Sequence, residues 1–198
     1  MKGGQYVILA LCGKSASGKD SIQKVLCEKY GFNRVVSHTT RPKRPNEVDG
    51  IDYHFVTEDE FIKMCQNDKL IEWRSYTPKT KNPNDTWYYG TSKEEVEGKI
   101  NPVCVIELKG LSELQRIYGK ENVFAVYIYL DNEVRTTRAS CRSGFYLGEW
   151  LRRLKTDNND FTFEDIIYNT DAQVENIDLE KAAKRINQLY LVHKGEIK

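Results

Sequence analysis

The chain has 198 residues, of which 39% are hydrophobic and 30% are charged, and its formal net charge is +1. This length suits one α/β domain with small insertions rather than two full domains. The near-neutral charge provides no overall attraction for a nucleic-acid backbone or an anionic membrane, so we expect neither as a partner.

The five cysteines are scattered, and no two of them have Cys-x-x-Cys spacing. An odd number of thiols among apolar neighbours indicates reduced, packed cysteines rather than a disulfide framework or a zinc site. The N-terminal apolar run is too short to span a membrane and carries no secretory signal. We therefore expect a cytoplasmic protein.

The apolar run at residues 6–12 is followed at once by a loop with glycine at both ends and a lysine after the second glycine. The glycines allow a tight bend that turns backbone N–H groups toward phosphate oxygens, and Lys19 adds a positive charge. The next segment has its apolar residues on one helical face, and the helix dipole points at the same phosphates. This pattern predicts a strand, a phosphate loop and a helix. The predicted ATP ligands here are Gly13, Lys14, Ser15, Ala16, Ser17, Gly18, Lys19, Asp20 and Ser21.

Asp20 stands where such a loop usually ends in Ser or Thr, whose hydroxyl binds Mg²⁺. A carboxylate is a hard oxygen ligand that suits this ion, so we predict that Asp20 holds the metal, directly or through one water. In the alternative, Asp20 only caps the first helical turn, and Ser21 or water serves the metal.

The pattern changes between residues 37 and 91, where short alternations of aromatic and polar residues predict half-exposed strands at 52–56 and 71–76. A helix between them begins with a capping box at residues 57–60, and a second capping box starts at Ser92. We interpret residues 37–91 as an inserted subdomain for a small substrate.

Further buried strands are predicted at 103–108 and 123–130, with helical patterns between them. This order favours a parallel sheet with right-handed crossovers. Residues 131–163 are rich in arginine and lack a clear apolar stripe, which indicates a mobile lid over the phosphates or, alternatively, a solvated helical pair. The last helix is expected at 178–191.

The stretch at residues 36–55, VSHTTRPKRPNEVDGIDYHF, closely resembles the monophosphate-binding region of guanylate kinases. The resemblance includes the phosphate loop, Phe61, LIEW at 70–73 and YYGTS at 88–92, and is good over roughly the first 110 residues. It implies one α/β P-loop kinase domain over residues 1–198, with a five-stranded parallel sheet flanked by helices. The core would comprise residues 1–36, 92–130 and 164–198, with the monophosphate-binding subdomain at 37–91 and the lid at 131–163.

The resemblance also implies transfer of the ATP γ-phosphoryl group to GMP, and to dGMP, with Mg²⁺ bound to ATP. Two forked guanidinium groups, Arg41 and Arg44, would clamp the GMP phosphate. Glu72 would read the base, because a carboxylate accepts guanine N1–H and N2–H₂ together but repels the acceptor N1 of adenine. The implied GMP ligands are Ser37, Arg41, Arg44, Tyr53, Glu72, Tyr89, Thr91 and Glu107.

In the lid, three arginines match family positions around the transferring phosphoryl group. Together with Lys19, the implied catalytic residues are Arg138, Arg142 and Arg153. Residues 165–169 resemble a late strand whose asparagine, Asn169, lies near the ATP adenine. The chain departs from the family pattern at Val105, where an acid is usual, in the spacer after Arg142, and at 78–85, an insertion predicted to form an exposed loop.

Two other functions stay open. Gly-Lys-Asp loops occur in related kinases that phosphorylate ribose 1,5-bisphosphate or deoxynucleotides, although Glu72 and the arginine clamp argue against a ribose-phosphate acceptor. Non-catalytic guanylate-kinase-like modules bind phosphorylated proteins, but Lys19 and the single-domain length argue against that function.

Overall fold

The computed structural model describes residues 6–77, 86–142 and 144–197, so the predicted loop at 78–85 lies outside the described residues. The chain divides into a core unit, Met1–Arg34 with Asn101–Lys198, and an inserted unit, Val35–Ile100. The inserted unit is longer than the predicted segment 37–91 at both ends. Helix α3 (Lys93–Glu97) directly follows a strand of this unit, and its Glu95 carboxylate accepts a hydrogen bond from Val36 N–H at 2.9 Å.

The core unit contains a five-stranded sheet in which every neighbouring pair is parallel. In sheet order the strands are β2 (Asn33–Arg34), β7 (Pro102–Val105), β1 (Ile8–Cys12), β8 (Val123–Tyr129) and β9 (Ala172–Glu175). All of β1 and most of β8 are buried, as expected for strands covered on both faces. The predicted parallel five-stranded sheet is confirmed.

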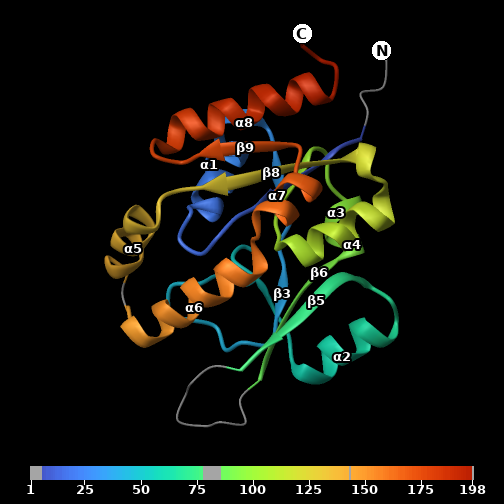
Figure 1. Cartoon of the computed structure of the whole chain (residues 1–198). Coiled ribbons are helices and arrows are strands. Elements are labelled where there is room, and N and C mark those ends of the chain that lie inside the picture. Colours follow the sequence, from blue (N-terminus) through green and yellow to red (C-terminus); the bar gives the residue numbers. More distant parts are fainter. Residues whose placement is uncertain (1–5, 78–85, 143, 198) are drawn as a thin grey trace. The chain divides into compact units, whose positions relative to one another are not determined.

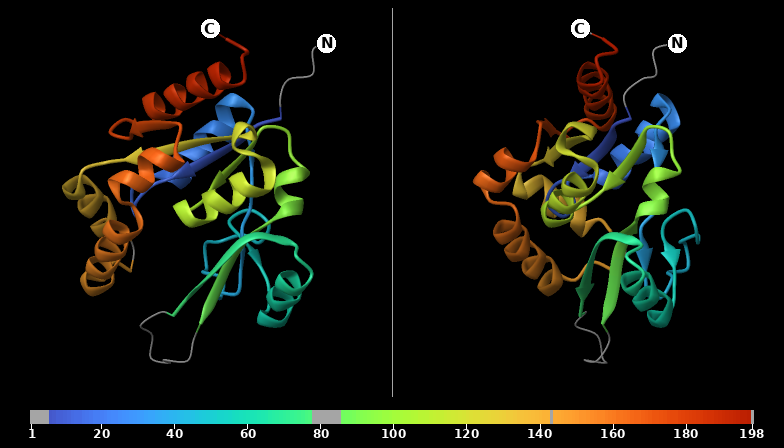
Figure 2. Two further views of the ribbon diagram at one scale, coloured as in Figure 1. Left: turned by 45° about the vertical axis from the view of Figure 1, so that its right-hand side comes forward. Right: turned by 90° about the vertical axis from the view of Figure 1, so that its right-hand side faces the viewer.

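Helices cover both faces of this sheet (Figure 1). One face is covered by α1 (Lys19–Tyr30) and α8 (Leu179–His193), which pack against each other, and α4 (Leu108–Tyr118) lies on the other face. The predicted lid segment forms α5 (Asn132–Ser140) and α6 (Leu147–Asp160), both of which belong to the core unit. A short helix, α7 (Phe163–Asn169), follows them. Figure 2 shows the ribbon of these helices and of the sheet from two further directions.

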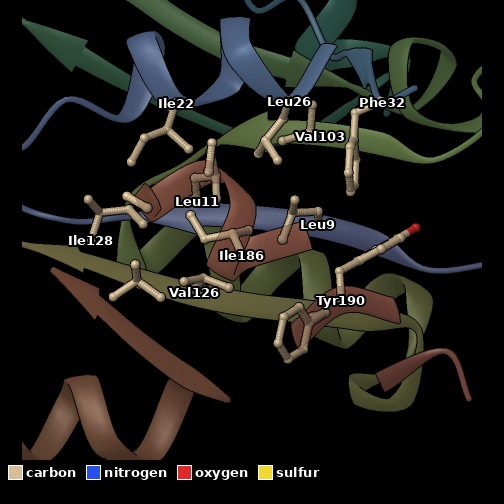
Figure 3. Packing of buried hydrophobic residues seen from close by; sticks show 14 of the residues in the cluster. Leu9, Leu11, Ile22, Leu26, Phe32, Val103, Val126, Ile128, Ile186 and Tyr190 are labelled. Carbon is tan, nitrogen blue, oxygen red and sulfur yellow. The ribbon is translucent and has the colours of Figure 1, made fainter. Parts of the chain in front are cut away.

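The main hydrophobic cluster lies between β1, β8 and the two helices α1 and α8 (Figure 3). Leu9 and Leu11, two residues apart on β1, point toward Ile22 of α1 and Ile186 of α8, as the period of a strand requires. Tyr190 fills the end of the cluster and donates its hydroxyl to Val7 C=O at 2.8 Å. Each fully buried aliphatic side chain of this kind contributes about 1.5–3 kcal/mol.

Two predicted strands differ in the structure. The strand expected at 103–108 ends at Val105, because Glu107 is the N-cap residue of α4. The late strand expected at 165–169 is wrong, because these residues belong to α7. Thr162 caps this helix by accepting a hydrogen bond from Asp165 N–H, and β9 begins only at Ala172.

The inserted unit contains a four-stranded mixed sheet. In sheet order the strands are β4 (His54–Phe55), β3 (His38–Thr39), β6 (Trp87–Ser92) and β5 (Leu70–Tyr76). The strand expected at 52–56 is thus shorter than predicted. Helix α2 (Glu58–Gln66) begins with the predicted capping box between Thr57 and Glu60. Ser92 caps α3, but Glu95 does not complete a second box there, because its carboxylate binds Val36, His54 and Lys99.

All five cysteines are free thiols, and Cys12 and Cys104 are buried. Burial raises the pKa of Cys12 to about 12, so this thiol stays protonated. Within the described ranges, no helix is long and apolar enough to cross a membrane.

Candidate functional site

The phosphate loop of the core unit requires glycine at both ends. Gly13 has φ +150°, and a Cβ there would lie 2.3 Å from the carbonyl oxygen of Ile128. Gly18 has φ +92°, and its Cβ would lie 2.3 Å from Asn176 Nδ2. Any larger residue would have to displace the neighbouring strand or Asn176, so the two glycines let the loop pass close to both.

Lys19, the first residue of α1, folds its side chain back onto this loop. Its Nζ donates hydrogen bonds to the carbonyl oxygens of Gly13 at 2.7 Å and Lys14 at 3.3 Å. Burial lowers the pKa of this ammonium, while the nearby carboxylates of Asp20, Asp157 and Glu107 oppose that shift. The loop therefore holds a cation that gains strongly from an incoming polyphosphate.

Helices α5 and α6 also contact the loop, through two residues that sequence reasoning missed. Asp157 of α6 accepts hydrogen bonds from Ser15 N–H at 2.9 Å and Ser15 Oγ at 3.1 Å. Arg135 of α5 donates Nε–H to Ser15 C=O at 2.8 Å and pairs with the Asp157 carboxylate. Charged residues in a polar, arginine-rich segment are usually exposed, so the sequence carries no signal for this buried pair.

Arg138, a predicted catalytic residue, lies beside the second glycine of the loop. Its Nη2 donates to Asn176 C=O at 2.8 Å, and its Nη1 would be 3.4 Å from a Cβ on Gly18. Asn176 is buried and donates Nδ2–H to Ser17 C=O at 2.8 Å. The structure thus brings Arg138 and Lys19 to the same loop.

Asn176 contacts the phosphate loop, whereas Asn169, which the resemblance places near the ATP adenine, ends α7 and contacts α4 through Ser112 and Gln115. Sequence reasoning chose the earlier asparagine because it placed the last strand of the sheet at residues 165–169 instead of at β9. The AQVEN run at 172–176, a short alternation ending in asparagine, was the signal that could have found it.

The other two predicted lid arginines are exposed. Arg142 follows the end of α5, and Arg153 on α6 donates Nε–H to Glu149 at 2.9 Å on the same helix. The structure does not bring these two guanidinium groups to the loop in the way that it brings Arg138.

Asp20 is exposed in the first turn of α1. The N-cap residue of α1 is Gly18, so Asp20 does not cap this helix. Glu107 was expected with the GMP ligands, but it lies in the core unit at the start of α4. Both carboxylates act on the Lys19 ammonium. One or two carboxylates beside a phosphate site fit Mg²⁺, which keeps several waters and binds substrate phosphates.

The remaining predicted GMP ligands all lie in the inserted unit, in two groups. In the first, Glu72 of β5 is paired across the strands with Thr91 of β6, and the buried Thr91 hydroxyl donates to Glu72 Oε1 at 2.8 Å. Ser37 Oγ lies 3.5 Å from Thr91 Oγ1. The Thr91 hydroxyl thus holds the carboxylate that is predicted to read the base.

The second group surrounds Arg41, whose side chain is only 5% exposed. Its Nη2 donates to both carboxylate oxygens of Glu47, at 2.7 and 2.9 Å, and its guanidinium lies over the Tyr53 ring. Burial disfavours the Arg41 charge, but the Glu47 carboxylate outweighs burial and raises the pKa of Arg41. Tyr89 packs edge-on against Tyr53, and Arg44 is 69% exposed. Sequence reasoning missed Glu47, the acid that fixes Arg41.

The chain is similar to a known protein family and to several of its members. The family model for guanylate kinase matches residues 5–191. The guanylate kinase of Onion yellows phytoplasma (strain OY-M) is 30% identical over 186 residues, which are 91% of this chain and 82% of that protein. The guanylate kinase of Schizosaccharomyces pombe is 32% identical over 191 residues, which cover 90% of this chain and 87% of that protein.

The fold is shared with solved structures as well. The crystal structure of guanylate kinase from Anaplasma phagocytophilum matches with a TM-score of 0.70 at 24% identity, covering 96% of this chain and 87% of that one. The family model covers nearly the whole chain and the relatives reach 30% identity or more, so the chain belongs to the guanylate kinase family.

Proposed function

We propose that the protein transfers the γ-phosphoryl group of ATP to GMP, and to dGMP, giving ADP and the nucleoside diphosphate. The observation that carries this proposal is Glu72, whose carboxylate is held by the buried Thr91 hydroxyl in a chain that also keeps an intact phosphate loop with Lys19. A carboxylate fixed in this way offers acceptors to guanine N1–H and N2–H₂, and an adenine would leave it unpaired.

The core unit would bind and align the triphosphate. The N-terminus of α1 would face the phosphates, and Lys19, held by the loop carbonyls of Gly13 and Lys14, would contact β- and γ-phosphate oxygens. Arg138, beside Gly18, adds a second cation. Phosphoryl transfer depends on alignment and charge neutralisation, so this mechanism requires no protein general base.

The inserted unit would hold the acceptor. Arg44, with its exposed guanidinium, and the hydroxyls of Tyr53 and Tyr89 are the proposed partners of the GMP phosphate. Arg41 would complete the phosphate clamp from a fixed position, because Glu47 and Tyr53 hold its side chain. Ser37 would complete the base site next to Thr91.

Magnesium is proposed as the cofactor, held by Asp20 and Glu107 together with phosphate oxygens. When bound, it would neutralise charge between the β- and γ-phosphates. Without the metal, the Asp20 carboxylate repels the triphosphate. Asp20→Ala should therefore strengthen metal-free ATP binding and weaken turnover with Mg²⁺. ATP titrations with and without Mg²⁺ into both proteins test this; identical metal dependence would remove Asp20 from the metal site.

An ADP-release assay tests the reaction itself. The protein is mixed with ATP and Mg²⁺ and one acceptor at a time: GMP, dGMP, AMP, UMP, CMP or ribose 1,5-bisphosphate. We expect turnover with GMP and dGMP and at least roughly tenfold lower efficiency with the others. Preference for ribose 1,5-bisphosphate would assign the chain to the related bisphosphate kinases. Absence of turnover with every acceptor would favour the phosphoprotein-binding module.

We place the reaction in the cytoplasm, where free thiols persist.

A further inference from the structure

Helices α5 and α6 hold Ser15, in the middle of the phosphate loop, through three hydrogen bonds. Asp157 accepts from the Ser15 N–H at 2.9 Å and from its hydroxyl at 3.1 Å, and Arg135 donates Nε–H to its carbonyl at 2.8 Å. The backbone donor, the backbone acceptor and the side chain of Ser15 are thus all engaged by one ion pair. Next to it, Lys14 Nζ donates to Asn158 of α6 at 2.9 Å.

This ion pair is buried, and each side chain of the pair makes three hydrogen bonds. Arg135 is 1% exposed and Asp157 is 7% exposed. The Arg135 Nη2 donates to Asp157, its Nη1 donates to Asn132 at 2.8 Å, and the guanidinium lies over the Trp150 ring. A buried ion pair adds little to the stability of a fold compared with apolar residues of similar volume. Stability therefore does not account for charged residues at these two positions.

The contacts with Ser15 have consequences for the loop. Backbone N–H groups of a phosphate loop ordinarily turn toward phosphate, but Ser15 N–H points at Asp157. The next residue, Ala16, has φ +61°, a conformation that is strained for any residue with a Cβ. Asp157 also acts electrostatically on Lys19. The Arg135 charge neutralises a carboxylate that would otherwise face the triphosphate from inside the protein.

Resting on the proposed function, we infer that Arg135 and Asp157 are positioning residues that set the shape of the phosphate loop for ATP. The pair fixes Ser15, and through Ser15 it fixes the Lys14 and Gly13 carbonyls that hold Lys19. Its loss acts on the ATP side of the reaction and leaves GMP binding unchanged, because the proposed GMP ligands of the inserted unit make no part of this contact.

A double variant separates positioning from stability. Arg135→Leu alone leaves the Asp157 carboxylate buried and unpaired, so we expect a lower melting temperature and at least about tenfold weaker ADP binding. Combining Arg135→Leu with Asp157→Ala removes both charges, so the melting temperature should recover toward that of the unmodified protein. The contacts with Ser15 are still missing, so kcat/KM for ATP should stay at least about fivefold low, with KM for GMP unchanged. The matched control is Arg116→Leu, which breaks an exposed pair with Glu113. It should change neither the melting temperature nor kcat/KM for ATP.

Three measurements decide the outcome: thermal unfolding, calorimetric ADP affinity and the separate KM values for ATP and GMP. The inference is overturned if the double variant regains ATP kinetics together with its melting temperature, or if KM for GMP rises as much as KM for ATP.

Should the double variant not fold, Ser15→Ala serves instead, since it removes only the hydroxyl bond to Asp157. It should lower kcat/KM for ATP about threefold, and no change would also overturn the inference. If the unmodified protein does not phosphorylate GMP, the proposed function fails, while ADP affinity still tests the pair.

Discussion

Lys19 and Glu72 are each fixed by neighbours within their own unit. The loop carbonyls of Gly13 and Lys14 hold the Lys19 ammonium, and the Thr91 hydroxyl holds the Glu72 carboxylate. Groups that are fixed before substrate binds need little reorganisation when charge develops, which is the basis of electrostatic catalysis and of selective binding. Single substitutions at these two residues therefore test the proposed chemistry most directly.

We predict that Lys19→Ala lowers kcat about 10²–10⁴-fold, which corresponds to about 3–5 kcal/mol of transition-state stabilisation. The ammonium would contact phosphate oxygens whose charge changes during transfer. The fold should persist, because the side chain contacts loop carbonyls rather than the hydrophobic cluster. Kinetics and circular dichroism check this, with Lys24→Ala on the exposed side of α1 as the control. Near-full activity of Lys19→Ala would exclude the loop from catalysis.

For Glu72→Gln we expect kcat/KM for GMP to fall at least about tenfold, or about 1.4 kcal/mol, and the preference for GMP over AMP to narrow. The amide keeps the shape of the side chain but replaces one acceptor with a donor, which faces the donors of guanine. An assay in which GMP and AMP compete as phosphoryl acceptors gives the ratio of their kcat/KM values. Glu94→Gln, exposed on α3, should leave it unchanged. A constant GMP:AMP ratio in Glu72→Gln would show that another group reads the base.

At the scale of elements, capping and charge decide where helices begin. The capping box at Thr57 was predicted correctly because all of its partners lie within four residues. The second box failed because Glu95 is bound by residues from elsewhere in the unit, Val36 and His54. In the lid segment, α5 and α6 are tied to the phosphate loop by the buried pair of Arg135 and Asp157. The mobility of this segment stays a prediction.

Thr57→Ala should destabilise the protein by about 1 kcal/mol, because Glu60 N–H loses its hydrogen-bond acceptor at the start of α2. Thr57→Ser keeps the hydroxyl and should retain most of the stability. Urea denaturation followed by circular dichroism gives both values. Equal losses in the two variants would mean that the methyl group of Thr57, and not its cap, stabilises the helix.

At the scale of the whole molecule, the two units have separate sheets and separate spectroscopic probes. Trp73 and Trp87 lie in the inserted unit, and Trp150 lies in the core unit. The inserted unit carries a pair of neighbouring histidines, His38 and His54, whose ring centroids lie 4.7 Å apart with the ring planes tilted by 31°. Burial, together with the neighbouring His54, lowers the pKa of His38 to about 4, and Glu95 opposes this only partly.

This pKa predicts a pH dependence of unfolding. An unfolded histidine has a pKa near 6.5, so between pH 6.5 and about 4 the unfolded chain binds a proton that folded His38 does not. The contribution of His38 to the free energy of unfolding should therefore be complete above pH 6.5. It should decrease as the pH drops toward 4. Urea titrations at pH 7.0 and 5.0, followed by tryptophan fluorescence, measure the loss. His38→Asn should lose less stability than the unmodified protein; an equal loss would assign the effect to other groups.

The sequence by itself determined the features that depend on neighbours in the chain. The apolar run, the two glycines and Lys19 specify a strand, a loop and a helix within about two dozen residues, because backbone freedom and the helix dipole are local properties. The parallel direction of the strands in the core sheet was also predicted from the sequence, since buried runs separated by helices allow few topologies. Glu72, the residue predicted to read the base, was identified from the LIEW motif at residues 70–73.

Only the tertiary structure decided which distant residues complete the phosphate loop. Asn176 contacts Ser17 across 159 positions of the chain, and Asp157 contacts Ser15 across 142. Short segments such as residues 163–169 suit a helix or a strand nearly equally, so long-range packing determines their state. A charged residue in the sequence is expected to be exposed, and it is buried only where a partner far along the chain supplies the opposite charge and hydrogen bonds, as Asp157 does for Arg135.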